Sequence, residues 1–302
     1  MSIFKKIINS LFIPEWCCAV RFNGKDILPN DTETPFTVIR DSYRYWTADP
    51  FLYKYGDKYY LFFEMYDRLK RKGLLGCREI SDNGYGKMRI IWEEPTHLSY
   101  PFIFSENGNI YIIPESGMSH ELFRLRSVDF PYKWEKDKTI CSQALADTTL
   151  LDYDGIRYYI SEKVDGSYVF DRVDLFYEEN GKFFECNENP VKSDVNTARC
   201  AGNIFNYNGR LIRPSQNCGK YYGEKLNFNE ILSISKNSYN ERFIKEISVS
   251  DIKLNVVNNF VGIHTYNKLD NIEVIDLKIS GRFNLLSVLG AVIKRIKNKL
   301  KK

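Results

Sequence analysis

A segment of 17 residues recurs four times along the chain, and this recurrence restricts the fold more than any other feature. The copies are ADPFLYKYGDKYYLFFE from Ala48, SYPFIFSENGNIYIIPE from Ser99, ADTTLLDYDGIRYYISE from Ala146 and CAGNIFNYNGRLIRPSQ from Cys200. In each copy two apolar or aromatic runs flank a two-residue turn: Gly56-Asp57, Asn107-Gly108, Asp154-Gly155 or Asn208-Gly209. Such dipeptides between apolar runs are the strongest short-range signal for a β-hairpin. The chain is therefore predicted to contain four hairpins of one design.

The spacing of the copies indicates how the hairpins are arranged. Their starts lie 51, 47 and 54 residues apart, close to the length of a four-stranded propeller blade with its loops. A weaker fifth copy begins at Val261 and has its turn near Asp270-Asn271. With 21 Tyr and 20 Phe among 302 residues, the composition also suits strands. We predict an all-β fold, a five-bladed β-propeller over residues 21–280; a two-sheet sandwich of unrelated hairpins is the alternative.

The two ends of the chain differ from this body in charge and pattern. Residues 281–302 carry seven basic and no acidic residues, and subtracting them from the net charge of +4 leaves −3 for residues 1–280. The apolar residues of this tail recur at helical spacing: Leu285, Leu289, Val292, Ile296 and Leu300. This pattern predicts a basic amphipathic helix that lies in an anionic membrane surface, and residues 1–20 have the same character in shorter form. A helix packed on the propeller and a nucleic-acid arm are the alternatives; nucleic acid is disfavoured because Phe283 is the only aromatic residue of the tail.

Other sequence signals concern location and cofactors. No run of eighteen apolar residues occurs, Met1–Phe12 lacks the features of a cleaved signal, and the seven cysteines show no paired metal spacing. We therefore expect a cytoplasmic protein, peripheral on the inner membrane face. There is no glycine-rich phosphate loop, so no cofactor is expected. No metal site is predicted either, with Ca²⁺ held by carboxylates in a central channel as an alternative.

Acidic residues gather at one end of the predicted hairpins. Folding each copy about its turn pairs Asp49 with Glu64, Tyr100 with Glu115, Asp147 with Glu162, and Ala201 with Gln216. The first strand of each blade lines the central channel of a propeller, so Asp49 and Asp147 are expected to face each other across its mouth. Arg199, Arg213, His97 and His264 occupy or adjoin the same repeat positions. Clustered carboxylates raise one another's pKa, which suits acid and base catalysis; a structural network of Glu–Arg pairs is the alternative.

The residues at these positions carry a resemblance to known families. The Ala48-Asp49-Pro50 segment, with Asp147 at the third copy, resembles the five-bladed propellers of glycoside hydrolase family 43, in which the first aspartate is the general base and the second orients. A larger set of motifs resembles the N-terminal propeller of glucosamine inositolphosphorylceramide transferases and its stand-alone bacterial relatives. These motifs lie between Trp46 and Ile275: ADPF, HLSYPF, IPE, DTTL, ARCAG, RPSQ and YG.

One departure from the hydrolase pattern concerns the general acid. The resemblance implies a glutamate at the start of the fourth copy, where this chain has Ala201-Gly202-Asn203. A glycosidase needs two carboxyl groups beside the scissile bond, so Glu115 or Glu162 would have to replace it. A substrate with a good leaving group, such as a nucleotide-linked or lipid-linked phosphosugar, needs no such acid. Arg199 and Arg213 would bind its phosphate.

These considerations predict a carbohydrate-active propeller, a sugar transferase in the synthesis of a surface polysaccharide or glycolipid. Asp49 is the expected base and Asp147 the orienting residue, while Glu115 and Glu162 are the further catalytic candidates. The residues expected to bind the sugar are Glu64, His97, Tyr100, Arg199, Arg213, Gln216 and His264. A hydrolase of the family 43 type and a non-catalytic glycan-binding module that partners a glycosyltransferase are the two alternatives.

Overall fold

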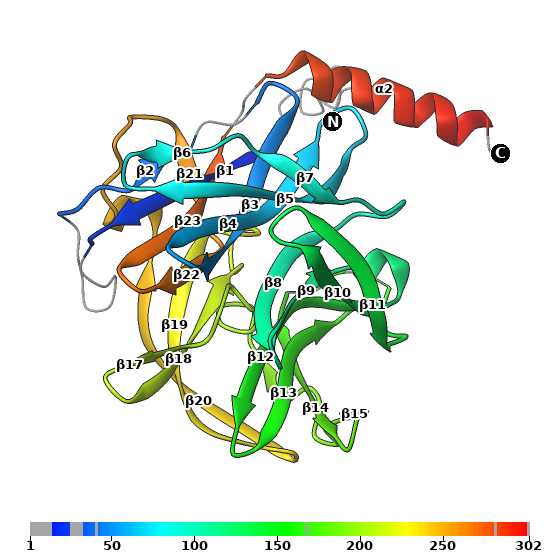
Figure 1. Ribbon diagram of the computed structural model, residues 1–302, viewed down its shortest axis with the longest axis vertical. Helices are drawn as coiled ribbons and strands as arrows, with labels where there is room; N and C mark the ends of the chain where they lie inside the picture. Colours follow the sequence, from blue (N-terminus) through cyan, green and yellow to red (C-terminus); the bar gives the residue numbers. More distant parts are fainter. Residues whose placement is uncertain are drawn as a thin grey trace.

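The computed structural model describes residues 14–24, 33–39, 42–166, 168, 170–280 and 283–300. These residues form five antiparallel sheets of four or five strands, followed by one helix (Figure 1). Four of the sheets are built from consecutive strands, and the fifth combines strands from both ends of the chain. The predicted five-bladed propeller with a C-terminal helix is therefore confirmed.

We number the blades along the chain by their innermost strands. Blade 1 comprises β3 (Tyr45–Tyr55), β4 (Lys58–Asp67), β5 (Lys72–Ser81), β6 (Gly84–Tyr85) and β7 (Arg89–Trp92). Blade 2 comprises β8 (Ser99–Glu106), β9 (Asn109–Glu115), β10 (Leu122–Asp129) and β11 (Lys133–Cys141), with the short helix η1 (Gly117–Ser119) after β9. Blade 3 comprises β12 (Leu145–Tyr153), β13 (Ile156–Lys163), β14 (Arg172–Glu179), β15 (Lys182–Glu185) and β16 (Lys192–Ser193).

The last two blades follow the same plan. Blade 4 comprises β17 (Phe205–Tyr207), β18 (Arg210–Asn217), β19 (Lys225–Ser235) and β20 (Ser238–Ile247), with the short helix η2 (Val249–Asp251) after it. Blade 5 comprises β21 (Phe260–Gly262), β22 (Tyr266–Leu269), β23 (Ile272–Ile279), β1 (Glu15–Phe22) and β2 (Thr37–Val38).

The first hairpin of every blade closes with the two-residue turn that the sequence predicts. In the turns of blades 2, 3 and 4 both central residues have positive φ, for example 49° at Asp154 and 72° at Gly155. This left-handed backbone matches the twist of the flanking strands, and Asn, Asp and Gly adopt it at least cost. The local chemistry of the turns therefore sets the blade pattern.

The N-terminal strand closes the ring. β1 pairs with β23 along its whole length, from Glu15 opposite Ile279 to Phe22 opposite Ile272. Arg68, after β4 of blade 1, donates two hydrogen bonds of 2.7 Å to the buried carboxylate of Glu15. The predicted boundary at residue 20 is therefore wrong, since residues 15–20 belong to blade 5. The rest of the predicted N-terminal segment, residues 1–13, lies outside the described residues.

The core lies between neighbouring blades and around the axis. The largest cluster of buried apolar residues joins blades 1 to 4. Near the axis, the ring of Phe51 meets the ring of Tyr100 edge-on, with centroids 4.8 Å apart. Aromatic side chains of this size fill the wedge between twisted sheets with large apolar area. This packing holds the starts of the inner strands at fixed positions around the axis.

The helix α2 (Leu285–Leu300) extends along one edge of the propeller, and its C-terminal end projects beyond the sheets (Figure 1). Asn284 begins it: its side chain accepts a hydrogen bond from the N–H of Leu286 at 2.9 Å and donates one to the carbonyl of Tyr43 at 3.2 Å. The predicted tail helix is thus confirmed over residues 285–300. None of the described helices is long and apolar enough to cross a membrane.

Candidate functional site

The starts of three inner strands share an unusual backbone. Asp49, Tyr100 and Asp147 have φ values of 49°, 44° and 49°, and the pairing of each hairpin shifts at that point. The residues opposite Glu64, Glu115 and Glu162 are therefore Ala48, Ser99 and Ala146.

The predicted pairing of Asp49, Tyr100 and Asp147 with the three glutamates is thus wrong by one residue. The reason is a β-bulge, which leaves one residue unpaired and redirects its side chain. In blade 4 the pairing also differs from the prediction: Cys200 bridges Ser215, and the N–H of Gln216 donates to the carbonyl of Arg199.

A cavity of about 350 Å³ lies beside these bulges at one end of the axis, and Asp49 is the one of the three redirected side chains that lines it. Its volume lies within the range typical of small-molecule sites. Its lining combines carboxylates, imidazoles, one guanidinium and a wall of aromatic rings: Asp49, Glu64, Glu115, His97, His264, Arg199, Trp16, Trp46, Tyr168, Phe170, Tyr222, Ser99 and Met118. Sugar rings present both hydroxyl groups and apolar faces, and these residue types complement both.

Asp49 lies at the centre of the acidic part of this cavity. One carboxylate oxygen accepts a hydrogen bond from the hydroxyl of Thr265 at 3.0 Å, and the other accepts one from the N–H of Tyr100 at 3.1 Å. Nε2 of His264 lies 3.4 Å from Oδ1. Burial raises the pKa of Asp49, His264 opposes this, and the net shift is upward. A carboxylate with a raised pKa is a stronger base than one in water.

Asp276 on β23 holds His264 in place, and the sequence analysis missed it. Its carboxylate lies 2.7 Å from Nδ1 of His264 and accepts backbone N–H groups of Asp49, His264 and Thr265, each at 3.0 Å. Burial alone would lower the pKa of His264, but the charges of Asp276 and Asp49 outweigh it and raise the pKa. An aspartate inside the apolar run IEVIDLK was the signal available in the sequence.

Asp49, His264 and Asp276 are also the residues that could bind a metal ion. One ligand atom each of Asp49, His264 and Asp276 lies within 4.8 Å of the others, so this group could hold a cation. Asp276, however, already accepts three backbone hydrogen bonds and contacts an imidazole, which satisfies it without an ion. The expectation that no metal is bound stays a prediction.

Glu64 is the carboxyl group with the least support. It is buried, and in the described part of the chain Oε1 has no hydrogen-bond partner. Nε2 of His97 lies 3.4 Å from that oxygen, while Nδ1 of His97 accepts the N–H of Gly73 at 2.9 Å. Because Nδ1 is an acceptor, a neutral His97 presents N–H toward Glu64. Burial, followed by the charge of Asp49, raises the pKa of Glu64 well above its usual value.

Glu115 has the opposite environment. It accepts hydrogen bonds from the hydroxyl of Tyr168 at 2.7 Å, the hydroxyl of Ser99 at 2.9 Å and the N–H of Gly117 at 3.1 Å. These three donors hold the side chain in one orientation. Glu115 therefore suits binding or orientation better than proton donation.

Arg199 joins Asp147 and Glu162 at the far side of the cavity. Its guanidinium donates to Asp147 at 2.6 Å and to Glu162 at 3.1 Å, and it lies 4.8 Å from the centroid of the Phe170 ring. Burial raises the pKa of Asp147 to about 7, although Arg199 opposes the shift. Gln216 donates to the same oxygen of Asp147 at 3.1 Å. Asp147, Glu162 and Gln216 are buried behind Arg199 and are not in the lining.

Two predicted site residues lie elsewhere. Arg213 is fully buried within blade 4, where it pairs with Glu241 at 2.6 Å and donates to the carbonyls of Ala198 and Thr197. The hydroxyl of Tyr100, also fully buried, accepts the N–H of Gly202 at 2.7 Å. The predictions that Arg213 holds a phosphate and that Tyr100 contacts the sugar are therefore wrong, because Arg213 is enclosed within blade 4 and the hydroxyl of Tyr100 lies between Thr149 and Gly202.

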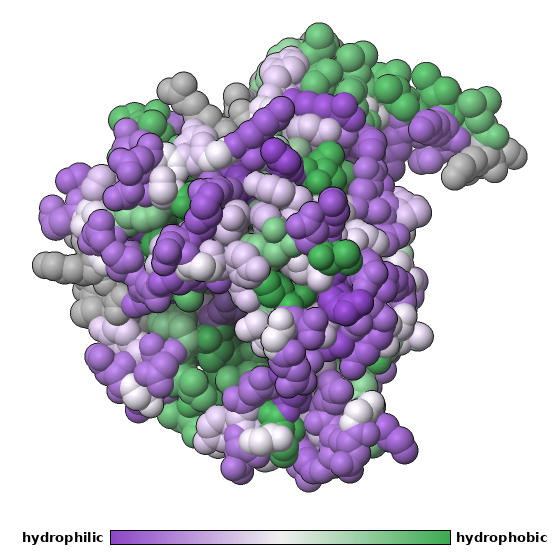
Figure 2. All heavy atoms as spheres, in the orientation of Figure 1, coloured by the Kyte–Doolittle hydropathy of each residue, from purple (hydrophilic) through white to green (hydrophobic). Residues whose placement is uncertain are grey.

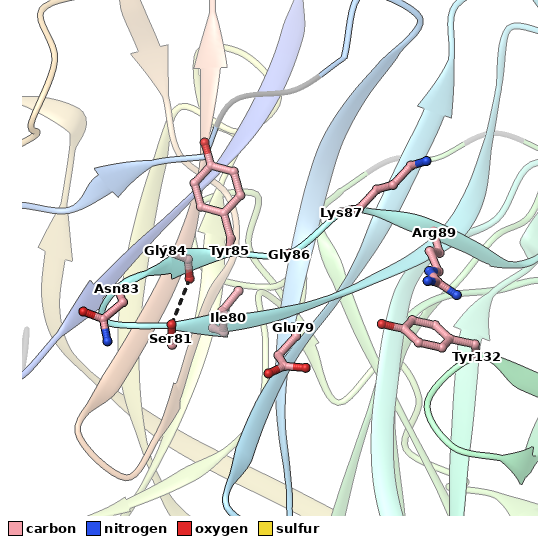
Figure 3. A pocket seen from close by; sticks show the side chains of 10 residues that line it. All are labelled: Glu79, Ile80, Ser81, Asn83, Gly84, Tyr85, Gly86, Lys87, Arg89 and Tyr132. Atoms are coloured by element: carbon pink, nitrogen blue, oxygen red, sulfur yellow. Dashed lines mark hydrogen bonds between the residues drawn. The ribbon is translucent and has the colours of Figure 1, made fainter.

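A second depression, of about 460 Å³, lies on the outer strands of blade 1, where the side chains around Glu79 and Arg89 line it (Figure 3). Most of its lining is exposed, including Ser81, Asn83 and Lys87. It contains no group of buried ionisable residues comparable with the axial cavity in the described structure. We therefore regard the axial cavity as the candidate site.

The fold and the cavity define a class: a five-bladed propeller with an acidic, aromatic-walled site at one end of its axis. Residues 38–278 match the family model for the N-terminal part of glucosamine inositolphosphorylceramide transferase 1. This match covers most of the chain, so the chain belongs to that family, as the motifs indicated.

Relatives with curated names are plant proteins. Over 202 residues the chain is 34% identical to glucosamine inositolphosphorylceramide transferase 1 of Arabidopsis thaliana and 33% identical to that of Oryza sativa subsp. japonica. The matched region is 64% of this chain but 26% and 27% of those proteins. The chain thus spans about a quarter of the length of the curated relatives it matches.

Glycoside hydrolases are among the solved structures with a similar fold. A family 117 enzyme of Zobellia galactanivorans aligns with a TM-score of 0.54 and 14% identity, covering 90% of this chain and 92% of that one. The catalytic domain of a family 62 α-L-arabinofuranosidase of Coprinopsis cinerea aligns with a TM-score of 0.56 and 9% identity, covering 89% and 98%. At such low identity these similarities concern the fold alone.

Proposed function

We propose that the axial cavity binds a sugar and that the protein transfers this sugar during assembly of a surface polysaccharide or glycolipid. The observation that carries the proposal is the pair formed by Asp49 and Glu64, two buried carboxyl groups in one cavity with different surroundings. Environments that separate the protonation of two carboxyl groups are the usual basis of acid and base roles. Membership of a family named for sugar transferases supports the same conclusion.

In the proposed reaction Asp49 accepts the proton of an acceptor hydroxyl. The freed oxygen forms a bond to the anomeric carbon of the donor sugar, and the bond from that carbon to the leaving group breaks. Glu64, protonated before the reaction, gives its proton to the leaving oxygen. The N–H of His97, 3.4 Å from Glu64, then stabilises the carboxylate that forms. Protons balance because Asp49 gains the one that the acceptor loses.

Arg199 has a different role from the one expected at first. Two carboxylates, Asp147 and Glu162, already neutralise it, so it offers little net charge to a phosphate. Since it lies beside three aromatic rings of the cavity, we assign it to the binding of sugar hydroxyls and to the orientation of Asp147. His264, stacked on Trp16 at 3.8 Å, holds Asp49 and binds the sugar. The cellular location we propose is the cytoplasmic face of the inner membrane.

A product assay with isosteric variants tests the function. The purified chain would be incubated with a panel of sugar nucleotides and of polyprenyl-linked or glycolipid acceptors, with products followed by mass spectrometry. We expect a glycosylated acceptor with the wild type and little product with Asp49→Asn or Glu64→Gln. Asp152→Asn is the matched control, because Asp152 lies on an inner strand at the exposed end and pairs with Arg157.

The other outcomes separate the competing functions. Release of free sugar without an acceptor, dependent on Asp49, would instead identify a hydrolase that uses water in place of the acceptor hydroxyl. Binding of a glycan that Asp49→Asn leaves intact, with no turnover of any donor, would identify a binding module. Transfer that survives Asp49→Asn would contradict the proposed base.

A further inference from the structure

Helix α2 lies at the same end of the propeller as the cavity. Gly290 of the helix packs against the loop that follows β4, so closely that a β-carbon at this position would lie 2.2 Å from the carbonyl oxygen of Arg68. Glu64 is on β4, three residues before that strand ends at Asp67. The positive charge of Lys294 adds to burial in lowering the pKa of His97, a cavity residue. The helix therefore lies beside the rim of the cavity.

The orientation of α2 is the reverse of that of an ordinary surface helix. Ser287 and Gly290 are its buried residues. Six apolar side chains of the helix are about half exposed or more: Leu285, Leu289, Val292, Ile293, Ile296 and Leu300. These positions fall on one stripe at 3.6 residues per turn, opposite the buried face. Figure 2 shows this apolar surface along the projecting helix. An amphipathic helix normally buries that stripe, so this one is available to a partner.

The charge of the helix indicates which partner covers the stripe. Residues 283–300 contain four basic residues, all exposed, and no acidic one: Lys294, Arg295, Lys297 and Lys299. Two such helices from two copies would bring like charges together. An apolar stripe flanked by lysines matches the interface of an anionic bilayer, where acyl chains receive the apolar residues and headgroups attract the cations.

We propose that α2 lies in an anionic membrane surface and holds the rim of the cavity at the bilayer, so that the sugar it processes is carried on a lipid. The membrane contact rests on α2 alone, whereas the lipid-carried sugar as substrate also rests on the proposed function. The charges of the cavity agree with it: Arg199 is the one guanidinium in the described lining, and two carboxylates neutralise it. In a glycolipid acceptor the phosphate is not bonded to the reacting hydroxyl, so it can remain near the lysines of α2 while the sugar enters the acidic cavity.

Vesicle binding by the full chain tests the membrane contact without any substrate. We expect co-sedimentation with vesicles of phosphatidylcholine containing about 30% phosphatidylglycerol, little with phosphatidylcholine alone, and a decrease at high salt. The double substitution Leu289→Asp and Ile296→Asp should reduce binding by at least about tenfold, since it places charges in the apolar stripe. Leu232→Asp is the matched control, because Leu232 is equally exposed but lies on blade 4.

A site-specific probe tests the orientation. In a Cys141→Ser background, in which the remaining native cysteines are buried, a fluorophore would be attached at Met118→Cys on the cavity rim or at Tyr153→Cys near the opposite end of an inner strand. Both native side chains are exposed. We expect nitroxide-labelled lipid headgroups to quench the probe at position 118 and not the probe at position 153.

Three results would overturn the proposal. The first is wild-type binding to anionic vesicles that the Leu289→Asp, Ile296→Asp protein retains. The second is no vesicle binding together with a dimer that these substitutions dissociate in sedimentation velocity, which would assign the stripe to a second copy. The third is equal quenching at positions 118 and 153. Sugar transfer to a soluble acceptor without vesicle binding would leave the proposed function intact and refute this inference alone.

Discussion

Two buried arginines show how this propeller separates structure from function. Arg199 and Arg213 are 14 residues apart in the sequence, and both are enclosed in or beside blade 4. Arg213 pairs with Glu241, which accepts further hydrogen bonds from Lys192 and Tyr239. Burial raises the pKa of Glu241, but the charges of Arg213 and Lys192 outweigh burial and lower the pKa to about 2. Arg199 faces Asp147, whose pKa burial raises to about 7.

The difference lies in the balance of charge. Around Arg213 two cations hold one carboxylate, so the ionised state is stable and nothing remains to exchange a proton. Beside Arg199 the carboxyl groups in and behind the lining of the axial cavity outnumber the cations, and in the described residues Oε1 of Glu64 has no hydrogen-bond partner. A buried charge with all its hydrogen-bond and ion-pair partners stabilises the fold. An excess of buried carboxyl groups beside a cavity indicates a site at which the substrate supplies the missing hydrogen-bond donors.

The largest change in the free energy of unfolding should come from replacing Arg213, and a smaller one from replacing Arg199. Arg213→Met leaves Glu241 in the protein interior with a single cation, and breaking a buried pair costs about 3–5 kcal/mol. Arg199→Met should cost clearly less near pH 6, because Asp147 can take up a proton there. Urea unfolding of both variants measures the two losses. Equal losses, or a larger one for Arg199→Met, would remove the distinction between the two regions.

Replacing a carboxylate by the isosteric amide should mainly lower activity in the axial cavity and mainly lower stability in blade 4. Asp49→Asn should lower turnover by about 10²–10⁴-fold and leave the free energy of unfolding unchanged or higher, since it removes a buried like charge. Glu241→Gln should destabilise the fold by about 3 kcal/mol through the loss of the partner of Arg213. Thermal unfolding and the product assay, run on both variants, check this. A strongly destabilised Asp49→Asn protein would contradict it.

Stability should also depend on pH in a way that separates the regions. Asp147 in the folded protein keeps a proton that the unfolded chain releases near its ordinary pKa of 3.8, so stability should fall as pH rises toward about 7. Between pH 5 and 8 the decrease should be about 2.5 kcal/mol.

Asp147→Asn should flatten this slope. Glu241 has a lowered pKa, so its contribution is present above about pH 4.5 and is lost as the pH falls toward 2. Urea unfolding at a series of pH values measures the loss of stability at low pH and the loss between pH 5 and 8. A stability that rises from pH 5 to 8 would contradict the account.

The smallest effect should come from two tyrosine hydroxyls. Tyr239→Phe removes a donor to Glu241 and should cost about 1 kcal/mol. Tyr168→Phe removes a donor to Glu115 at the partly exposed wall of the cavity and should change stability by less. Its effect should appear instead in KM for the sugar. A KM that stays constant would exclude Tyr168 from the binding of substrate.

The blades could be predicted from the sequence, because two-residue turns act locally and repeat at a regular period. The bulges at Asp49 and Asp147 could not, because aspartate adopts positive φ in ordinary turns as well, so its presence at these positions does not indicate a bulge. The position of Trp16 in the wall of the cavity could not be predicted either. It depends on β1, at the N-terminus, closing the ring beside β23.

The error over Arg213 was avoidable. Arg213 and Gln216 lie three residues apart on β18, and side chains alternate between the two faces of a strand, so the two cannot share a site on one face. Gln216 does reach Asp147, whereas Arg213 faces Glu241. The role of Glu64 could not be predicted in the same way, since the absence of a hydrogen bond to its Oε1 among the described residues is a property of the folded cavity.

A direct measurement of protonation tests the central claim, that the axial carboxyl groups are held ready to exchange protons and the blade 4 carboxyl is not. Carbon-13 NMR of the protein labelled at glutamate Cδ would follow each carboxyl group through a pH titration, with Glu64→Gln and Glu241→Gln identifying the two signals. We expect Glu64 to titrate well above its ordinary pKa of 4.5 and Glu241 near 2. Two signals that both titrate between pH 4 and 5 would contradict the account.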